Sequence, residues 1–189
     1  MARSGSGFAG FVGGFVFALF ALVLFGYVYL KYGHPPVSTA DPSFPMEAQI
    51  VHVPLGARIA KEMKQPPFGP SEEAFQSAAH IYKSECAGCH GTPGQDVAYA
   101  KWMYPDAPQL WKKHGHGAVG VSDDEPGETY WKVANGIRLT GMPAYQHILS
   151  EEQMWQVSLL LKNADQQLSP TVMGILTEQA NPLPTPVQK

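Results

Sequence analysis

Cysteine is scarce in this chain of 189 residues, which contains only Cys86 and Cys89. A structural zinc site is therefore disfavoured, because such sites close with four ligands that usually come from two separated pairs, and the sequence has no second pair. A thioredoxin-like redox pair is disfavoured too, since that motif is typical of a βαβ setting and the residues before Cys86 indicate a helix. A single disulfide between the two cysteines remains open.

Charged side chains are also few. Asp, Glu, Lys and Arg make up 15% of the residues and the formal net charge is -3, which argues against nucleic acid as a partner because nucleic-acid-binding proteins carry excess positive charge. Residues 71–165 contain 12 acidic and 7 basic side chains, a net of -5. A domain of that sign would be steered toward a basic docking face on a partner.

A long apolar run is present near the N-terminus. It extends over 23 uncharged residues from Phe8 to Leu30, with Arg3 before it and Lys31 after it. At 1.5 Å per residue this run can cross the roughly 30 Å hydrocarbon core of a membrane. The apolar part of a cleavable signal peptide would have only about 7 to 15 residues. We predict an uncleaved transmembrane anchor over residues 8–30, preceded by a short N-terminal segment, residues 1–7.

Proline is concentrated in residues 31–70, which show little helical periodicity. This pattern predicts an extended linker or a wrapping segment that forms no core of its own. The apolar cluster Ile50, Val51, Val53 and Leu55 indicates that part of it lies on a protein surface, either its own or a partner's. At about 3.1 Å per residue, a polyproline segment of that length could lift the following domain on the order of 100 Å from the membrane. The eight prolines are Pro35, Pro36, Pro42, Pro45, Pro54, Pro66, Pro67 and Pro70.

The remaining sequence predicts helices and no strands. Ser71, followed by Glu72 and Glu73, is typical of a helix N-cap, and an apolar face recurs at helical spacing up to Cys86. A second helix is predicted over residues 127–134, ended by Asn135-Gly136.

The last predicted helix starts at a capping box. Ser150 and Gln153 have the spacing of that motif, and an apolar stripe continues to about Ala164. Residues 166–189, which include Pro182, Pro184 and Pro186, lose the pattern and are predicted to be a loosely held tail.

Both cysteines belong to the run Cys86-Ala87-Gly88-Cys89-His90, which is the pattern of covalent haem c attachment. Two thiols at this spacing can add to the two vinyl groups on one side of a porphyrin, and the adjacent histidine then lies over the iron. We therefore predict one covalent haem c, with Cys86 and Cys89 as thioether anchors and His90 as the proximal ligand.

Met142 is the candidate for the second axial ligand. It lies in Gly141-Met142-Pro143, past the second predicted helix, where glycine and proline fix an unusual backbone path. Methionine in that position raises the reduction potential. The rivals are Met103, for which core packing is expected, and His114 and His116, which alternate with glycine in a loop that we expect to be solvated.

These motifs resemble those of a class I c-type cytochrome, specifically the membrane-anchored bacterial type with one haem, over residues 71–165. The attachment motif, the helix before it and the methionine loop carry the resemblance, together with Ala107-Pro108-Gln109-Leu110 and the helix from Tyr130 to Gly136. The resemblance implies an all-α fold in which the first and last helices of the domain cross, with Phe75 or Tyr82 meeting Trp155. Residues 101–122 are longer than a minimal member of that family needs.

The resemblance also implies further contacts to the haem. The carbonyl of Pro108 would accept the Nδ1 hydrogen of His90, and Leu110 would pack on the haem face. Tyr130, Trp131 and Arg138 are candidates for contacts to the porphyrin rim or its propionates.

With His90 and Met142 both on the iron, no position is left for a substrate, which favours one-electron transfer over catalysis. The first hypothesis is a membrane-anchored electron carrier of a respiratory chain, which would exchange electrons with redox partner proteins. The alternative is a cytochrome c subunit fixed within a larger membrane oxidoreductase. A haem sensor or a peroxidase-like enzyme with an open sixth position is a third hypothesis.

The same resemblance implies a location. Haem c is attached outside the bacterial cytoplasmic membrane, so residues 1–7 are expected in the cytoplasm and everything after Lys31 in the periplasm.

Overall fold

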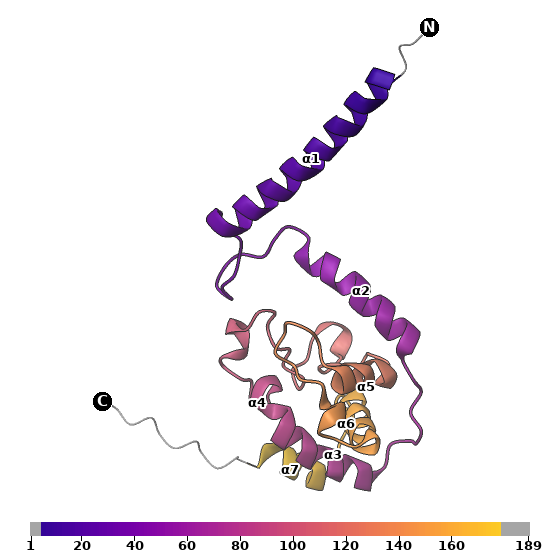
Figure 1. The fold of residues 1–189 in the computed structure, drawn as a ribbon. Helices are drawn as coiled ribbons and strands as arrows, with labels where there is room; N and C mark the ends of the chain where they lie inside the picture. Colours follow the sequence, from indigo (N-terminus) through magenta and orange to yellow (C-terminus); the bar gives the residue numbers. More distant parts are fainter. Residues whose placement is uncertain (1–4, 179–189) are drawn as a thin grey trace, which may run out of the picture. The chain divides into compact units, whose positions relative to one another are not determined.

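The computed structural model describes residues 5–178, and the described residues form an all-α structure with no strand (Figure 1). The predicted fold class is confirmed. The chain divides into two compact units, one up to Pro45 and one from Met46 onward. Arg3 and the three tail prolines, Pro182, Pro184 and Pro186, lie outside the described residues.

The first unit is dominated by helix α1 (Gly5–Tyr32). Its stretch from Gly7 to Tyr32 has a mean hydropathy of 2.5, none of it is buried within the structure, and it is long and apolar enough to cross a membrane. Lys31 lies over the rings of Tyr27 and Tyr32 at its C-terminal end. Tyrosine and lysine are typical of the level where a helix leaves the bilayer.

The main core of the second unit lies between helices α3 (Glu72–Glu85), α6 (Glu151–Lys162) and α7 (Pro170–Thr177) (Figure 1). Ser71 caps α3 by accepting the amide of Ala74, as predicted. The predicted capping box of α6 is present in full, with Ser150 and Gln153 satisfying each other's backbone amides. Fully buried residues of this core include Ala79, Tyr82, Val157, Leu160 and Val172.

A second cluster joins α6 to helix α5 (Pro126–Asn135), which ends at Gly136 as expected. Trp155 of α6 stacks on Tyr130 of α5, with ring centroids 4.0 Å apart. The expected contact of Trp155 with Phe75 or Tyr82 is therefore wrong, although α3 and α6 do pack together. Tyr82 instead packs against Trp111 in an edge-to-face arrangement, with the ring centroids 5.6 Å apart. Its hydroxyl donates to the backbone carbonyl of Gly91.

The predicted extended linker contains helix α2 (Glu47–Glu62), which corrects the sequence-based expectation. Pro54 lies inside this helix, where proline normally removes one backbone hydrogen bond. Tertiary contacts compensate, because Ile59 is buried and α2 packs against α5. Residues 47–62 therefore belong to the second unit and not to a free linker.

The tail prediction also needs correction, because α7 occupies residues 170–177. Ser169 caps it by accepting the amide of Val172, and Pro170 occupies its first turn, where proline is well tolerated. Val172 and Leu176 are fully buried against the core. Two turns of the predicted tail thus complete the main core.

Candidate functional site

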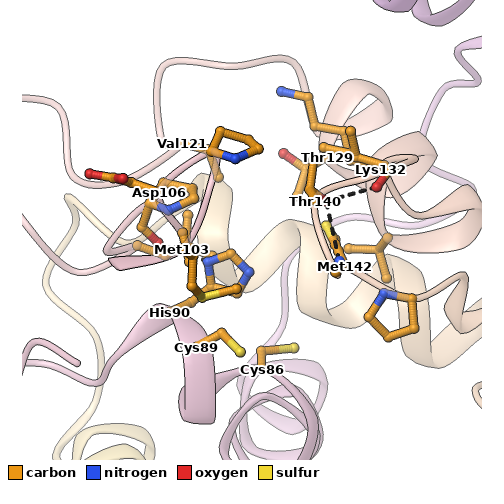
Figure 2. A pocket seen from close by; sticks show the side chains of 18 of the residues that line it. Cys86, Cys89, His90, Met103, Asp106, Val121, Thr129, Lys132, Thr140 and Met142 are labelled. Carbon is orange, nitrogen blue, oxygen red and sulfur yellow. Dashed lines mark hydrogen bonds between the residues drawn. The ribbon is translucent and has the colours of Figure 1, made fainter. Parts of the chain in front are cut away.

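A cavity of about 290 Å³ lies between the end of α3 and the loop that follows α5 (Figure 2). That volume is close to the lower end of the range of small-molecule sites. Cys86, Cys89, His90 and Met142 all line it. The cavity therefore brings together the four residues that the sequence nominated as haem anchors and axial ligands.

His90 lies in the single turn of helix α4 (Ala87–His90), which follows α3 almost without interruption. Its Nδ1 is 2.8 Å from the carbonyl oxygen of Pro108. Because a carbonyl can only accept, Nδ1 donates and Nε2 is left as the nitrogen with a free lone pair. Burial lowers the pKa of His90, and the Pro108 carbonyl opposes that shift. The ring is therefore held as a neutral imidazole, the form that binds a metal.

Side chains from three segments hold the backbone of the cysteine motif. The Tyr82 hydroxyl donates to the carbonyl of Gly91 at 2.8 Å, and the amide of Gln109 donates to the carbonyl of Cys89 at 3.0 Å. The Tyr145 hydroxyl donates to the carbonyl of Glu85 at 2.6 Å. These bonds fix the motif from the side of α3, from the loop after it and from the short helix η3 (Tyr145–His147).

The cysteines themselves are free thiols in the structure, which does not support the single-disulfide alternative. Burial raises the pKa of the Cys86 thiol to about 12, with the charges of Glu85 and Cys89 adding to the shift. Among the described residues, no three His, Cys, Asp or Glu side chains are grouped so that they could hold a metal ion. A closed zinc site is thus not supported either.

Met142 is presented from the loop after α5. Figure 2 shows it on the opposite side of the cavity from His90. Its amide donates to the Thr140 hydroxyl at 3.2 Å, and that hydroxyl donates to the carbonyl of Ile137 at 2.7 Å. The backbone turns through Gly136, with φ 65°, and Gly141, with φ 83°.

The chemistry of the lining fits a haem. A flat apolar group with two coordination positions needs ligands on opposite faces, thiols at one edge and apolar walls elsewhere. The cavity offers an imidazole and a thioether on opposite sides and two cysteines between them (Figure 2). Its other walls are largely apolar, with Leu110, Val121, Val133, Ile137 and Leu161 among the lining residues.

The other nominated residues divide into two groups. Pro108 and Leu110 line the cavity, in keeping with the resemblance. Tyr130, Trp131 and Arg138 are not among the lining residues: Tyr130 stacks on Trp155, the Trp131 indole donates to Glu62 at 2.9 Å, and Arg138 is exposed. The haem contacts expected for these three therefore find no support at the cavity.

The rival ligands are also placed differently from one another. Met103 lines the cavity instead of packing in either buried cluster, so the expectation of core packing is wrong. The Nε2 of His114 lies 2.6 Å from the carbonyl of Gly120, and His114 is not among the lining residues. The side chain of His116 lies outside the described part of the structure.

Sequence reasoning missed several lining residues. Thr129 and Lys132 come from α5. Residues three or four apart lie on the same face of a helix, so the prediction of this helix could have placed both on one face. His52 and Leu55 come from α2. The apolar cluster that includes Leu55 indicated contact with a protein surface, but it did not link either residue to the cavity, because the helix itself was not predicted.

The comparisons with known proteins agree with this geometry. Residues 73–159 match the family described as cytochrome C oxidase, cbb3-type, subunit III. The match begins in the first turn of α3 and ends inside α6, so it covers the cysteine motif and the loop of Met142. No curated protein and no solved structure matches the chain.

Proposed function

Because residues 73–159 form a c-type cytochrome domain, a family with covalently bound haem c, we propose that the chain carries single electrons for a respiratory chain through one haem held in this cavity. The observation that carries the proposal is the placement of His90 and Met142 on opposite walls of the cavity. When bound, haem c takes up and releases one electron at its iron. A pair of protein ligands leaves no position for a substrate, so the chain by itself is not an enzyme.

Each residue has a defined task in this proposal. The Cys86 and Cys89 sulfurs hold the group covalently at one edge, and the Nε2 of His90 and the sulfur of Met142 bind the iron. The Pro108 carbonyl, 2.8 Å from Nδ1 of His90, fixes the ring orientation and raises its basicity. The apolar walls, among them Leu110 and Val133, exclude water, which favours the less charged, reduced iron.

The anchor supports a location at the membrane. Helix α1 has the length and hydropathy of a single span, and haem c attachment outside the bacterial cytoplasmic membrane would put the cytochrome domain in the periplasm, with residues 1–7 in the cytoplasm. A tethered carrier meets membrane-bound partners at a high effective concentration.

A second candidate function is a fixed subunit of a larger membrane oxidoreductase. It is favoured by the family description, which is that of a cytochrome C oxidase subunit. Exposed apolar side chains on α2 suit a partner surface as well, since Ile50 and Val53 are more than half exposed. The third hypothesis, an open sixth position for a sensor or peroxidase, is disfavoured because Met142 lies across the cavity from His90.

The test uses the full chain purified in mild detergent. Colour that survives acid-acetone extraction would establish covalent haem, and iron content per chain would give the number of haems. We expect Met142→Ala to change the spectrum of the reduced protein and to admit carbon monoxide, whereas the matched control Met103→Leu should do neither. An unchanged spectrum in Met142→Ala would refute this ligand assignment. Stoichiometric co-purification of other membrane subunits would exclude the free carrier.

A further inference from the structure

Helix α2 lies outside the matched residues 73–159, yet it contributes to the candidate haem cavity. His52 and Leu55 are among the lining residues. With Ile59 and Glu62 they occupy positions i, i+3, i+7 and i+10, which fall on one face of a helix. That face is turned toward the cytochrome domain, since Ile59 is buried and Glu62 accepts a hydrogen bond from it.

Two contacts fix α2 at its C-terminal half. The Trp131 indole of α5 donates to Glu62 at 2.9 Å, and Arg58, which is bonded to both carboxylate oxygens of Glu62 at 3.0 Å, lies 5.5 Å from the centre of the Trp131 ring. The chain leaving α2 then passes directly over the start of α5. A Cβ on Gly127 would lie 2.1 Å from the carbonyl oxygen of Lys64, so only glycine admits this approach.

The place of α2 beside α5 indicates which edge of the haem it faces. In a haem attached at Cys86 and Cys89, the thioether bonds would hold the vinyl edge of the porphyrin there, and the two propionates would leave from the opposite edge. Thr129 and Lys132 of α5 lie on the side of the cavity away from the cysteines (Figure 2). His52, which is exposed, and Leu55, which is half-buried, both line the cavity. Because α2 packs on α5, we infer that they do so on the α5 side, near this propionate edge.

Few donors are available there for a carboxylate. Lys132 lines the cavity but is already paired with Glu128 at 2.7 Å and Asp124 at 3.2 Å. Arg138, the cation expected from the sequence, is exposed and is not among the lining residues. The imidazole of His52 has one N–H even when neutral, and a hydrogen bond to a charged acceptor is among the stronger kinds.

We propose that α2 forms a wall of the haem site, in which Leu55 excludes water from the porphyrin edge and His52 donates a hydrogen bond to a haem propionate. The proposal rests on the function proposed above. It makes the segment that follows the membrane anchor part of the redox centre, so a chain shortened to the matched residues would lack one wall of its haem cavity.

The experiment compares substitutions on the two faces of α2 in the full chain in detergent. Leu55→Ala and His52→Ala change the inner face, and Val53→Ala, whose side chain is 71% exposed, is the matched control. The readouts are the midpoint potential and the rate at which added cyanide replaces the sixth ligand of the oxidised haem. We expect Leu55→Ala to react severalfold faster and to have a lower potential, because water then stabilises the more charged, oxidised iron.

The histidine has its own control. His52→Ala should lower the potential by leaving the propionate charge without its donor, and His52→Gln, which keeps an N–H donor, should restore most of it. Equal lowering by His52→Ala and His52→Gln would overturn the hydrogen bond. Potentials and cyanide rates of Leu55→Ala that equal those of Val53→Ala would overturn the wall.

A third pair of variants, Glu62→Ala and Glu62→Gln, tests whether the docking of α2 on α5 keeps the wall in place. Glu62 does not line the cavity, so Glu62→Ala should accelerate cyanide entry only by releasing α2, and Glu62→Gln, which can still accept from Trp131, should do so less. An effect of equal size in both variants would count against docking through Trp131. If the wild-type chain carries no covalent haem, the proposed function fails. If it carries haem but the α2 variants change neither the midpoint potential nor the rate of cyanide binding, only the present proposal fails.

Discussion

The two walls of the cavity are held in different ways. On the histidine wall, Tyr82, Gln109 and Tyr145 donate hydrogen bonds to backbone carbonyls between Glu85 and Gly91, across 9, 20 and 60 residues of sequence respectively. On the methionine wall, the contacts of Thr140 are local and the neighbouring Leu139 is 89% exposed. A segment with few buried contacts opens at a lower free energy than the rest of the fold. The methionine wall is therefore expected to open first.

The two walls nevertheless share one feature. Gly91 follows the histidine turn with φ 72° and ψ -177°, and Gly136 follows α5 with φ 65° and ψ -179°. A Cβ would lie 2.7 Å from the carbonyl oxygen of Gln95 at the first site and 2.6 Å from that of Met142 at the second. Each wall thus includes, at the end of a helix, a position that only glycine can occupy without displacing its neighbour.

The largest effect is expected from Gly136→Ala. The new methyl group adds backbone strain and pushes on the carbonyl of Met142, so we expect the unfolding free energy to fall by about 3 kcal/mol and methionine ligation to be lost. Chemical denaturation and visible spectra measure the two effects. Gly94→Ala is the control, because Gly94 has φ 79° but no atom near its Cβ position and should cost only about 1 kcal/mol. Equal stability of the two variants, with methionine still bound, would contradict the prediction.

Tyr82→Phe should weaken the histidine wall alone. It keeps the ring in the core but leaves the carbonyl of Gly91 without its donor, which should cost about 1–3 kcal/mol of unfolding free energy. The methionine ligand should stay on the iron, as judged from the visible spectrum. Tyr104→Phe, at a residue 41% exposed, should change the stability by no more than about 0.5 kcal/mol. A spectrum without methionine ligation in Tyr82→Phe would mean that the walls are not independent.

Thr140→Val should act on the methionine wall with a smaller effect. It removes the hydroxyl that bridges Met142 and Ile137 at a cost of about 0.5–1.5 kcal/mol. We expect faster replacement of methionine by added cyanide, with less change in global unfolding than in Tyr82→Phe. Thr92→Val is the control, because Thr92 bonds to Gln95 through its backbone and the substitution keeps those bonds. Cyanide rates that are the same in both variants would show that the loop is held by other contacts.

The last effect is absent at neutral pH and is confined to alkaline pH. Burial raises the pKa of Tyr145 to about 12, with the charges of Cys86 and Glu85 adding to the shift, whereas an unfolded tyrosine ionises near pH 10. The folded state therefore favours the neutral phenol. Its contribution is complete below pH 10 and is lost as the pH rises from 10 to 12. Chemical denaturation between pH 10 and pH 12 should show a smaller loss of unfolding free energy in Tyr145→Phe than in the wild type. Equal losses in the two proteins would show that ionisation of Tyr145 does not contribute.

The sequence predicted the elements whose signals are local. Ser71 and the Ser150 box marked helix starts through side chains that reach only three residues ahead, and Gly136 marked a helix end. His90 and Met142 were nominated from patterns of five residues or fewer, and both line the cavity. Their placement on opposite walls of the cavity depends on how α3, α5 and α6 pack together, and no local sequence pattern predicts that packing.

The failures have physical causes as well. Pro54 hid α2, because helix propensity penalises proline and the compensating hydrogen bond to Glu62 comes from Trp131 of α5, about 70 residues away. Trp131 and Arg138 were nominated by resemblance, but the indole bonds to α2 and the guanidinium lies away from the cavity lining. The start of α7 did carry a signal, a serine cap followed by Pro170, that the proline-rich tail obscured.

The docking of α2 shortens the tether. Only residues 33–46, 14 residues between the end of α1 and the start of α2, are left to connect the membrane helix to the cytochrome domain. Fully extended, they reach about 50 Å, roughly a third of the about 140 Å that 40 free residues, 31–70, would reach. Reducing the radius to a third lowers the volume that the domain can search on the order of 20-fold, which raises its local concentration by the same factor. If the chain acts as proposed, its second unit is restricted to redox partners within this short reach of the anchor.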